Sequence, residues 1–294
     1  MKLYAPRYYK NFICIADRCE HSCCIGWEID IDEPTLDGYK RLKGGYAERI
    51  IESISFEGTP HFALCEHERC PHLNGEGLCN IILNLGEGHL CDICREHPRF
   101  YNYTDACEVG LGISCREAAR LVLSSPDYSV MEEIGEVDGV EPAIGFNGRN
   151  ERGRIYAILR DGTLDYQARI AKIRADYGID MLSDGEALAM IEGLEYLDVA
   201  HRELFLNYSS KALAVGCEDY LERALAYFIY RHCTEAYDEE DFRARLAFCL
   251  FCERLLSSLI VSQDAKTLND IAVLASIISE EIEYSEENTE MLTY

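Results

Sequence analysis

Eleven of the fifteen cysteines in this 294-residue chain lie within its first 115 residues. The densest run is Cys14-x4-Cys19-x3-Cys23-Cys24, which ends in two adjacent thiols. Packing explains adjacent cysteines poorly, because alanine and valine fill small apolar positions without the risk of oxidation. Thiolates are ligands for zinc and for iron–sulfur clusters. The run therefore predicts a metal site in the first part of the chain.

The alternative to a metal site is a framework of disulfide bonds, and the choice depends on the compartment. The N-terminus, MKLYAPRYYKNF, lacks the apolar core of roughly 7 to 15 residues that marks a signal peptide. No stretch approaches the ~18 apolar residues that a membrane span needs. We therefore expect a cytoplasmic protein without a membrane partner. In a reducing compartment cysteines bind metals more often than they form bridges, and an odd number cannot all pair.

The net charge of −25 argues against a nucleic-acid partner, because binding to phosphates requires a basic surface. A basic protein partner or substrate would complement such an acidic chain. Solubility alone explains the charge equally well, and the sequence leaves both explanations open. It gives no indication of the oligomeric state.

The spacing of apolar residues predicts a mainly α fold with two domains. Residues 1–130 form the first, an irregular cysteine-rich metal-binding domain with a short strand or hairpin over 27–32. Residues 131–294 form the second, an all-α helical bundle that starts with an acidic, glycine-bearing linker over 131–150. Helices are expected over 34–43, 46–54, 79–85, 115–123, 154–160, 164–177, 185–197, 218–237, 241–258 and 268–284.

The cysteines fall into two kinds. Cys249 and Cys252 stand three positions apart in an apolar helical stretch, which indicates buried structural thiols, and Cys217 and Cys233 are similar. The first half instead contains the local pair Cys91-x2-Cys94, which metal sites commonly combine with distant ligands. Three histidines are interleaved with the cysteines there, and we expect them at the surface or beside a ligand rather than on the metal: His61, His67 and His72.

The identity of the metal is less constrained. A zinc ribbon needs two C-x2-C pairs, and this part of the chain has one. Iron–sulfur clusters accept thiolates from separate loops, so an iron–sulfur cluster is favoured and zinc is the alternative. Ferredoxin spacing is absent, and Gly26 stands where radical S-adenosylmethionine enzymes need a third cysteine. P-loop, dinucleotide-binding, metalloprotease and serine-hydrolase motifs are absent as well.

Several blocks over about residues 4–125 resemble the flagellin lysine-N-methylase family, whose cysteine-rich part is similar to zinc- or iron-chelating CxxCxxCC domains. The blocks are Tyr9-x2-Phe12-x-Cys14-x4-Cys19-x3-Cys23-Cys24-x-Gly26-Trp27-x-Ile29-x-Ile31-Asp32, then Cys70-Pro71-x-Leu73 with Gly77-x-Cys79-x-Ile81, then Leu85-Gly86 with Leu90-Cys91-x2-Cys94-Arg95-x2-Pro98-Arg99, and Ser114-Cys115 before Glu117-Ala118-Ala119.

The resemblance implies an enzyme that moves a methyl group from S-adenosylmethionine to lysine ε-amines of flagellin, and that contains an iron–sulfur cluster of the [4Fe–4S] type. The positions that match the family's cysteines are Cys14, Cys19, Cys23, Cys24, Cys70, Cys79, Cys94 and Cys115, with Cys91 as a ninth. Nine thiols exceed the four that one cluster needs. Either some of them do not bind the metal or there are two metal sites.

A lysine must lose its proton before it can attack a methyl group, which requires a base. The candidates are Glu20, Glu28, Asp30 and Tyr101. Arg95 and Arg99 are candidates for binding the donor's carboxylate or tuning the cluster, and ion pairing in an acidic protein explains them equally well. Trp27 is either a cation–π partner of the donor's sulfonium or a core aromatic residue.

No Rossmann-type site for S-adenosylmethionine is visible, and the chain is shorter than expected for a full-length flagellin methylase. A second interpretation therefore stays open, in which zinc or a cluster stabilises a non-catalytic interaction protein.

Overall fold

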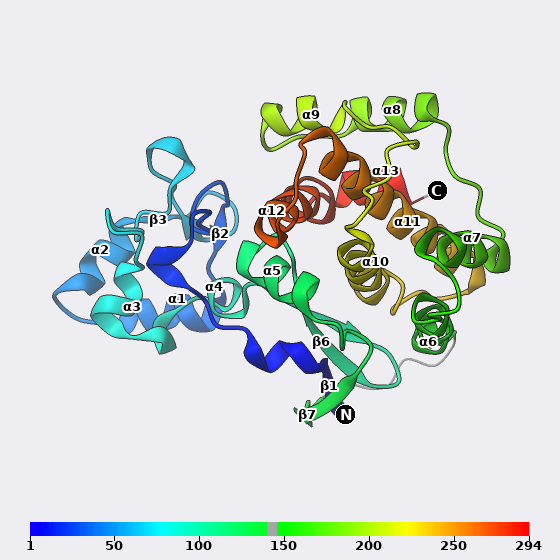
Figure 1. The fold of residues 1–294 in the computed structure, drawn as a ribbon. Helices are drawn as coiled ribbons and strands as arrows, with labels where there is room; N and C mark the ends of the chain where they lie inside the picture. The colour runs from blue at the N-terminus through cyan, green and yellow to red at the C-terminus, as the bar shows by residue number, and fades with distance from the viewer. Residues whose placement is uncertain (140–145, 294) are drawn as a thin grey trace. The chain divides into compact units, whose positions relative to one another are not determined.

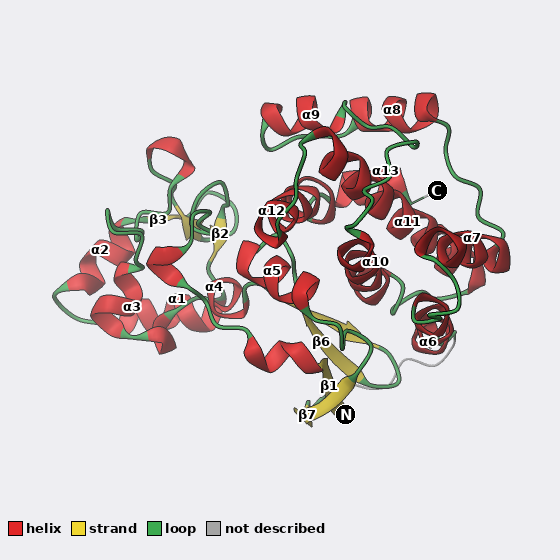
Figure 2. Cartoon of the chain, viewed as in Figure 1, coloured by secondary structure: helices red, strands yellow, loops and turns green. Residues whose placement is uncertain are grey.

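Helices dominate the structure, as the apolar spacing predicts, and the mainly α fold class is confirmed (Figure 2). The structure is a computed structural model that describes residues 1–139 and 146–293. It divides into two compact units, the cysteine unit Ile13–Pro98 and the helical unit Met1–Phe12 with Arg99–Tyr294. The domain boundary expected after residue 130 falls inside the helical unit.

The cysteine unit contains four short α-helices and a small antiparallel sheet (Figure 1). Its sheet has the order β2-β4-β3. A core of apolar side chains, among them Ile29, Tyr39 and Phe62, fills the unit. The elements are β2 (Ile29–Asp30), α1 (Glu33–Arg41), α2 (Tyr46–Glu52), β3 (Ile54–Ser55), β4 (His61–Phe62), α3 (Asn80–Leu85) and α4 (Asp92–Glu96), with one-turn 3-10 helices at Ala16–Arg18, Glu66–Glu68 and Glu87–His89.

The helical unit begins with a four-stranded sheet of order β5-β6-β1-β7. The sheet joins β1 (Lys2–Pro6), β5 (Arg99–Tyr103), β6 (Cys107–Leu111) and β7 (Met131–Glu136), with β1 and β6 parallel. A 3-10 helix over Arg7–Asn11 follows β1. The prediction of a linker over 131–150 is therefore wrong at both ends. Its first residues form β7, which pairs with β1, and its last residues begin α6 at Gly148. Its residues 140–145 lie outside the described residues.

The remaining helices pack around a single apolar core. Their bounds are α5 (Arg116–Ser124), α6 (Gly148–Leu159), α7 (Tyr166–Tyr177), α8 (Asp184–Gly193), α9 (Val199–Phe205), α10 (Glu218–His232), α11 (Glu239–Ser262), α12 (Leu268–Ile278), a π-helical turn (Ser279–Glu283) and α13 (Glu286–Leu292). Helices α9 and α13, like α4 of the cysteine unit, were not predicted. Within the described part of the chain, no helix has the length and apolarity needed to cross a membrane.

Cys233, Cys249 and Cys252 are buried in this core, as expected for structural thiols. The Sγ atoms of Cys233 and Cys249 lie 3.7 Å apart. Cys217 is half-buried and precedes α10.

Replacing either of two glycines of α6 with alanine should change the stability of the protein in opposite directions. A Cβ atom at Gly148 would collide with the carbonyl oxygens of Cys233 and Thr234, whereas one at Gly153 would meet nothing within 4 Å. Because backbone atoms cannot move aside cheaply, Gly148→Ala should lower the free energy of unfolding by about 1–3 kcal/mol. Gly153→Ala should raise it by about 0.5–1 kcal/mol, since alanine suits a helix interior better. Urea denaturation of both variants tests the pair, and equal effects would contradict the close approach at Gly148.

Candidate metal centre

Five thiols converge in the cysteine unit. Cys70 and Cys91 are part of its buried core, and three half-buried cysteines pack against that core: Cys24, Cys79 and Cys94. Two of the five come from the local pair predicted from the sequence, and the other three come from separate loops. Five of the nine predicted ligands thus share one core, and among the described residues no three of their Sγ atoms lie within 4.8 Å of one another.

Backbone pairing places Cys24 beside Cys70. The N–H of Cys70 donates to the carbonyl of Cys24 at 2.8 Å, and the N–H of Gly26 donates to the carbonyl of Glu68 at 3.0 Å. Gly26 has a φ of +82°, a conformation that glycine adopts without strain. The double cysteine is therefore held against a loop more than forty residues away.

The other three thiols lie at short helices. Cys79 is the residue before α3, and its backbone bridges to Leu73. Cys91 is the residue before α4, and Cys94 follows inside that helix. Residues three apart lie on the same side of a helix, and the interaction between the two thiols lowers the pKa of Cys91 and raises the pKa of Cys94.

The thiols influence one another's ionisation. A hydrogen bond from Cys23 is the largest cause that lowers the pKa of Cys24 to about 7. Burial acts against this shift, and Ser22 and Arg69 add to it. Burial, together with the charges of Cys24 and Cys79, raises the pKa of Cys70 to about 12. Crowded thiols in an apolar core cannot all ionise without a counter-charge, and a metal cation provides one. The donor set therefore fits a thiolate-bound metal.

The remaining predicted ligands lie at the edge of the unit or outside it. Cys14 and Cys23 are exposed, and Cys19 is half-buried with its thiol donating to the carbonyl of His21 at 2.8 Å. Cys115 belongs to the helical unit, where it precedes α5. These four positions stay sequence-based predictions.

The predicted catalytic and donor-binding residues are divided between the two units. In the cysteine unit, Glu20, Glu28 and Asp30 are exposed and Trp27 is half-buried. Arg95 contacts Asp92, lies 3.7 Å from Glu96 and donates to the carbonyl of Leu90. These contacts match the ion-pairing interpretation of Arg95.

Tyr101 and Arg99 lie on β5 in the helical unit. The ring of Tyr101 stacks on that of Tyr103, with 6.2 Å between their centroids. The Arg99 Nε donates to the Tyr9 hydroxyl at 2.9 Å.

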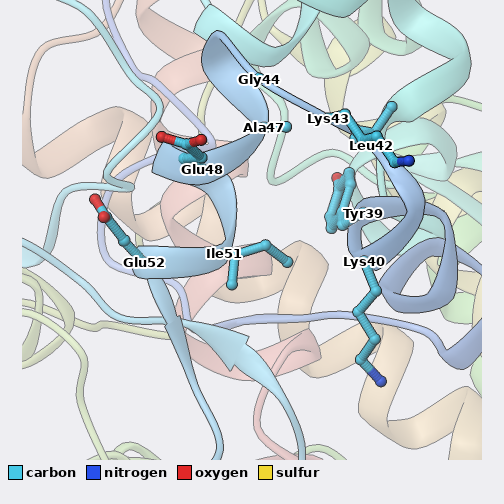
Figure 3. A pocket seen from close by; sticks show the side chains of 9 residues that line it. All are labelled: Tyr39, Lys40, Leu42, Lys43, Gly44, Ala47, Glu48, Ile51 and Glu52. Carbon is cyan, nitrogen blue, oxygen red and sulfur yellow. The ribbon is translucent and has the colours of Figure 1, made fainter.

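Tyr39 is a neighbour of the thiols that the sequence did not reveal. Its hydroxyl donates to the carbonyl of His89 at 2.6 Å and lies 3.7 Å from the Sγ of Cys91. In the sequence Tyr39 only marks the apolar face of α1, and local spacing cannot show a contact 52 residues away. Its ring also lines an open hollow of about 460 Å³ between α1 and α2, to which α2 contributes Ile51 (Figure 3).

The histidines were expected at the surface or beside a ligand, and His72 is buried near Cys70. His72 is 2% exposed, and its two ring nitrogens lie 2.6 Å from the Tyr46 hydroxyl and 3.0 Å from the Ser53 hydroxyl. Burial, assisted by the charge of Arg49, lowers the pKa of His72 to about 4. Because both nitrogens are engaged, His72 supports the loop beside Cys70 and is not available as a ligand.

Comparisons with known proteins find distant relatives. No family model matches the chain. No solved structure matches it either. A 136-residue stretch, 44% of the chain, is 25% identical to the flagellar biosynthetic protein FliU of Salmonella muenchen, covering 80% of that protein. At the same identity and length it matches the lysine-N-methylases of Salmonella choleraesuis and Salmonella typhimurium, covering 34% of each. Over less than half its length, the chain is therefore similar to flagellar and lysine-methylating proteins of Salmonella.

Proposed function

We propose that the protein is a lysine N-methyltransferase that moves a methyl group from S-adenosylmethionine to lysine ε-amines of flagellin or a similar protein. The similarity to two lysine-N-methylases and to a flagellar biosynthetic protein supports the reaction class and the acceptor. The matched stretch spans about a third of the lysine-N-methylases. Their substrates and the remainder of their machinery are therefore part of the proposal.

The convergence of five thiols carries the cofactor part of the proposal. Four of Cys24, Cys70, Cys79, Cys91 and Cys94 would hold an iron–sulfur cluster of the [4Fe–4S] type, with zinc as the alternative. Their origin in separate loops, with only one C-x2-C pair, supports a cluster over a zinc ribbon. A bound cluster supplies one-electron redox chemistry.

The protein's own residues would have to deprotonate the acceptor. A base first takes a proton from the lysine ammonium. The nitrogen lone pair then attacks the methyl carbon, the carbon–sulfur bond breaks and S-adenosylhomocysteine leaves. Glu28 and Asp30 are carboxylates of the cysteine unit whose exposure makes them accessible to a protein substrate. Glu20, which is exposed as well, and Tyr101 on β5 are the other two candidate bases. The net charge of −25 attracts a lysine-bearing partner.

One observation favours the second interpretation, a metal-stabilised interaction protein without catalysis. The strands of the cysteine unit have two residues each, and its longest helix has nine. Such short elements need an additional source of stability, and metal binding provides folding free energy. A structural metal is thus compatible with the same thiol set.

Methyl transfer distinguishes the two functions. We expect the anaerobically purified full chain to transfer label from S-adenosylmethionine to purified flagellin, and the label to appear on lysine after hydrolysis. Flagellin with acetylated lysines is the control, because acetylation removes the nucleophilic amine. Absence of labelled lysine with both oxidised and reduced protein, at full metal content, would contradict the methyltransferase and leave the interaction protein.

A further inference from the structure

The small sheet of the cysteine unit has two chemically different faces. Side chains alternate along a strand, so the sequence Glu28-Ile29-Asp30-Ile31 separates carboxylates from isoleucines. Ile29 and Ile31 are 5% and 3% exposed and belong to the same core as Cys70 and Cys91. Glu28 and Asp30 are exposed on the opposite face. The thiols therefore occupy the core side of the sheet, and two carboxylates occupy its outer side.

Pairing with β4 adds an imidazole to these carboxylates. His61 is the register partner of Asp30 in the antiparallel pair of β2 and β4. The ligand atoms of Glu28, Asp30 and His61 all lie within 4.8 Å of one another, and no other such Cys, His, Asp or Glu set occurs among the described residues. The side chain of His61 is 16% exposed, and its Nδ1 lies 2.8 Å from the carbonyl of Thr59 and 3.3 Å from Glu28 Oε1. The ring is thus held in place beside the carboxylates.

The charges at this face are uncompensated. No lysine or arginine forms an ion pair with Glu28 or Asp30 in the part of the chain that the structure describes, and Glu28 pairs with His61. Two carboxylates this close repel each other, and a cation between them removes the repulsion. A divalent ion that binds one ligand atom each from Glu28, Asp30 and His61 would remove this repulsion.

The ligand types select the ion. Carboxylates suit hard cations and imidazole suits first-row transition metals, so two carboxylates with one imidazole favour Mn²⁺ or Fe²⁺. We propose that Glu28, Asp30 and His61 form a second metal site, for a divalent ion of this class, on the face of the sheet opposite the thiols. Three protein ligands leave coordination positions open to water or to a substrate oxygen. The fold thereby separates a soft, thiol-based site from a hard, oxygen-based one.

A titration of the full chain with Mn²⁺ tests the site, because thiolates compete weakly for this ion. The electron paramagnetic resonance signal of free Mn²⁺ reports binding. We expect one equivalent to bind, and binding to weaken at least about tenfold in Asp30→Asn and in His61→Ala. The matched control is Glu66→Gln, which changes another exposed carboxylate of the cysteine unit and should leave Mn²⁺ binding unchanged.

The test is independent of methyl transfer and of the thiol site. Asp30 is exposed, so Asp30→Asn should keep the circular dichroism and the iron content of the wild-type chain. A wild-type chain that binds no Mn²⁺, or an Asp30→Asn variant that binds it as tightly as wild type, would overturn the proposal. If Glu66→Gln weakened Mn²⁺ binding as much as Asp30→Asn, the proposal would be overturned too. Such a result would indicate that Mn²⁺ responds to the overall acidic charge and not to a defined site.

Discussion

Replacing Cys94 with serine is expected to remove the metal from the cysteine unit. Cys94 packs against the core that contains Cys70 and Cys91, and it interacts directly with the thiol of Cys91. A serine hydroxyl is a poor ligand for iron–sulfur clusters and zinc, which prefer soft thiolates. Anaerobically purified Cys94→Ser should therefore lose the thiol-bound metal, measured as iron together with inorganic sulfide, or as zinc.

Cys65→Ser is the matched control for this variant. Cys65 is an exposed cysteine of the same unit and is not among the five converging thiols. Its substitution should leave the metal content at the wild-type level. Because metal binding contributes folding free energy, Cys94→Ser should also make residues 13–98 sensitive to limited proteolysis. Full content of the thiol-bound metal in Cys94→Ser would contradict Cys94 as a ligand.

Arg152→Met is expected to lower the free energy of unfolding of the helical unit by about 3–5 kcal/mol, the usual cost of breaking a buried ion pair. The two terminal nitrogens of Arg152 donate to Glu108 at 2.7 and 2.9 Å, and Glu108 is fully buried. Arg152 also donates to Thr234 at 2.6 Å and lies 4.9 Å from the centroid of the Tyr230 ring. Methionine would leave the carboxylate of Glu108 with Arg149 as its remaining recorded cationic contact.

Arg154→Met on the same helix is the control. Arg154 pairs with Glu151 at the surface, and its side chain is 73% exposed. An exposed pair of this kind contributes about 0–1 kcal/mol. Urea denaturation of both variants measures the difference. Equal destabilisation by the two substitutions would show that the pair with Glu108 does not stabilise the helical unit.

The helices were predictable because their signals are local. Asp32 is the N-cap of α1 and Pro34 lies in its first turn, and the Asp32 carboxylate accepts a hydrogen bond from the N–H of Thr35 at 2.9 Å. The apolar spacing of residues 241–258 likewise predicted α11, which extends over Glu239–Ser262. Each of these signals depends on residues within one or two turns.

The four-stranded sheet was not predictable in the same way. Strand β1 pairs with β6 and β7, more than one hundred residues later in the chain. Strand β7, Met131–Glu136, is exposed along its second half and lacks the alternation of a half-buried strand. Its acidic, glycine-containing sequence therefore indicated a linker. The N-terminal strand β1 belongs to the helical unit for the same reason, because its partners lie in that unit.

The sequence indicated the cysteines of the candidate site, but it did not indicate which other residues lie beside them. The family resemblance pointed to Cys24, Cys70, Cys79, Cys91 and Cys94 among its nine positions, and these five share the core of the cysteine unit. The contact between Tyr39 and Cys91 and the approach of His61 to Asp30 depend on pairings between distant segments. No local pattern contains that information.

The metal content and visible spectrum of the anaerobically purified protein test the central claim most directly. A [4Fe–4S] cluster on the converging thiols predicts a brown protein with about four iron and four sulfide atoms per chain. The broad visible absorption should disappear in Cys94→Ser and persist in Cys65→Ser. A colourless wild-type protein containing stoichiometric zinc and no inorganic sulfide would contradict the iron–sulfur centre.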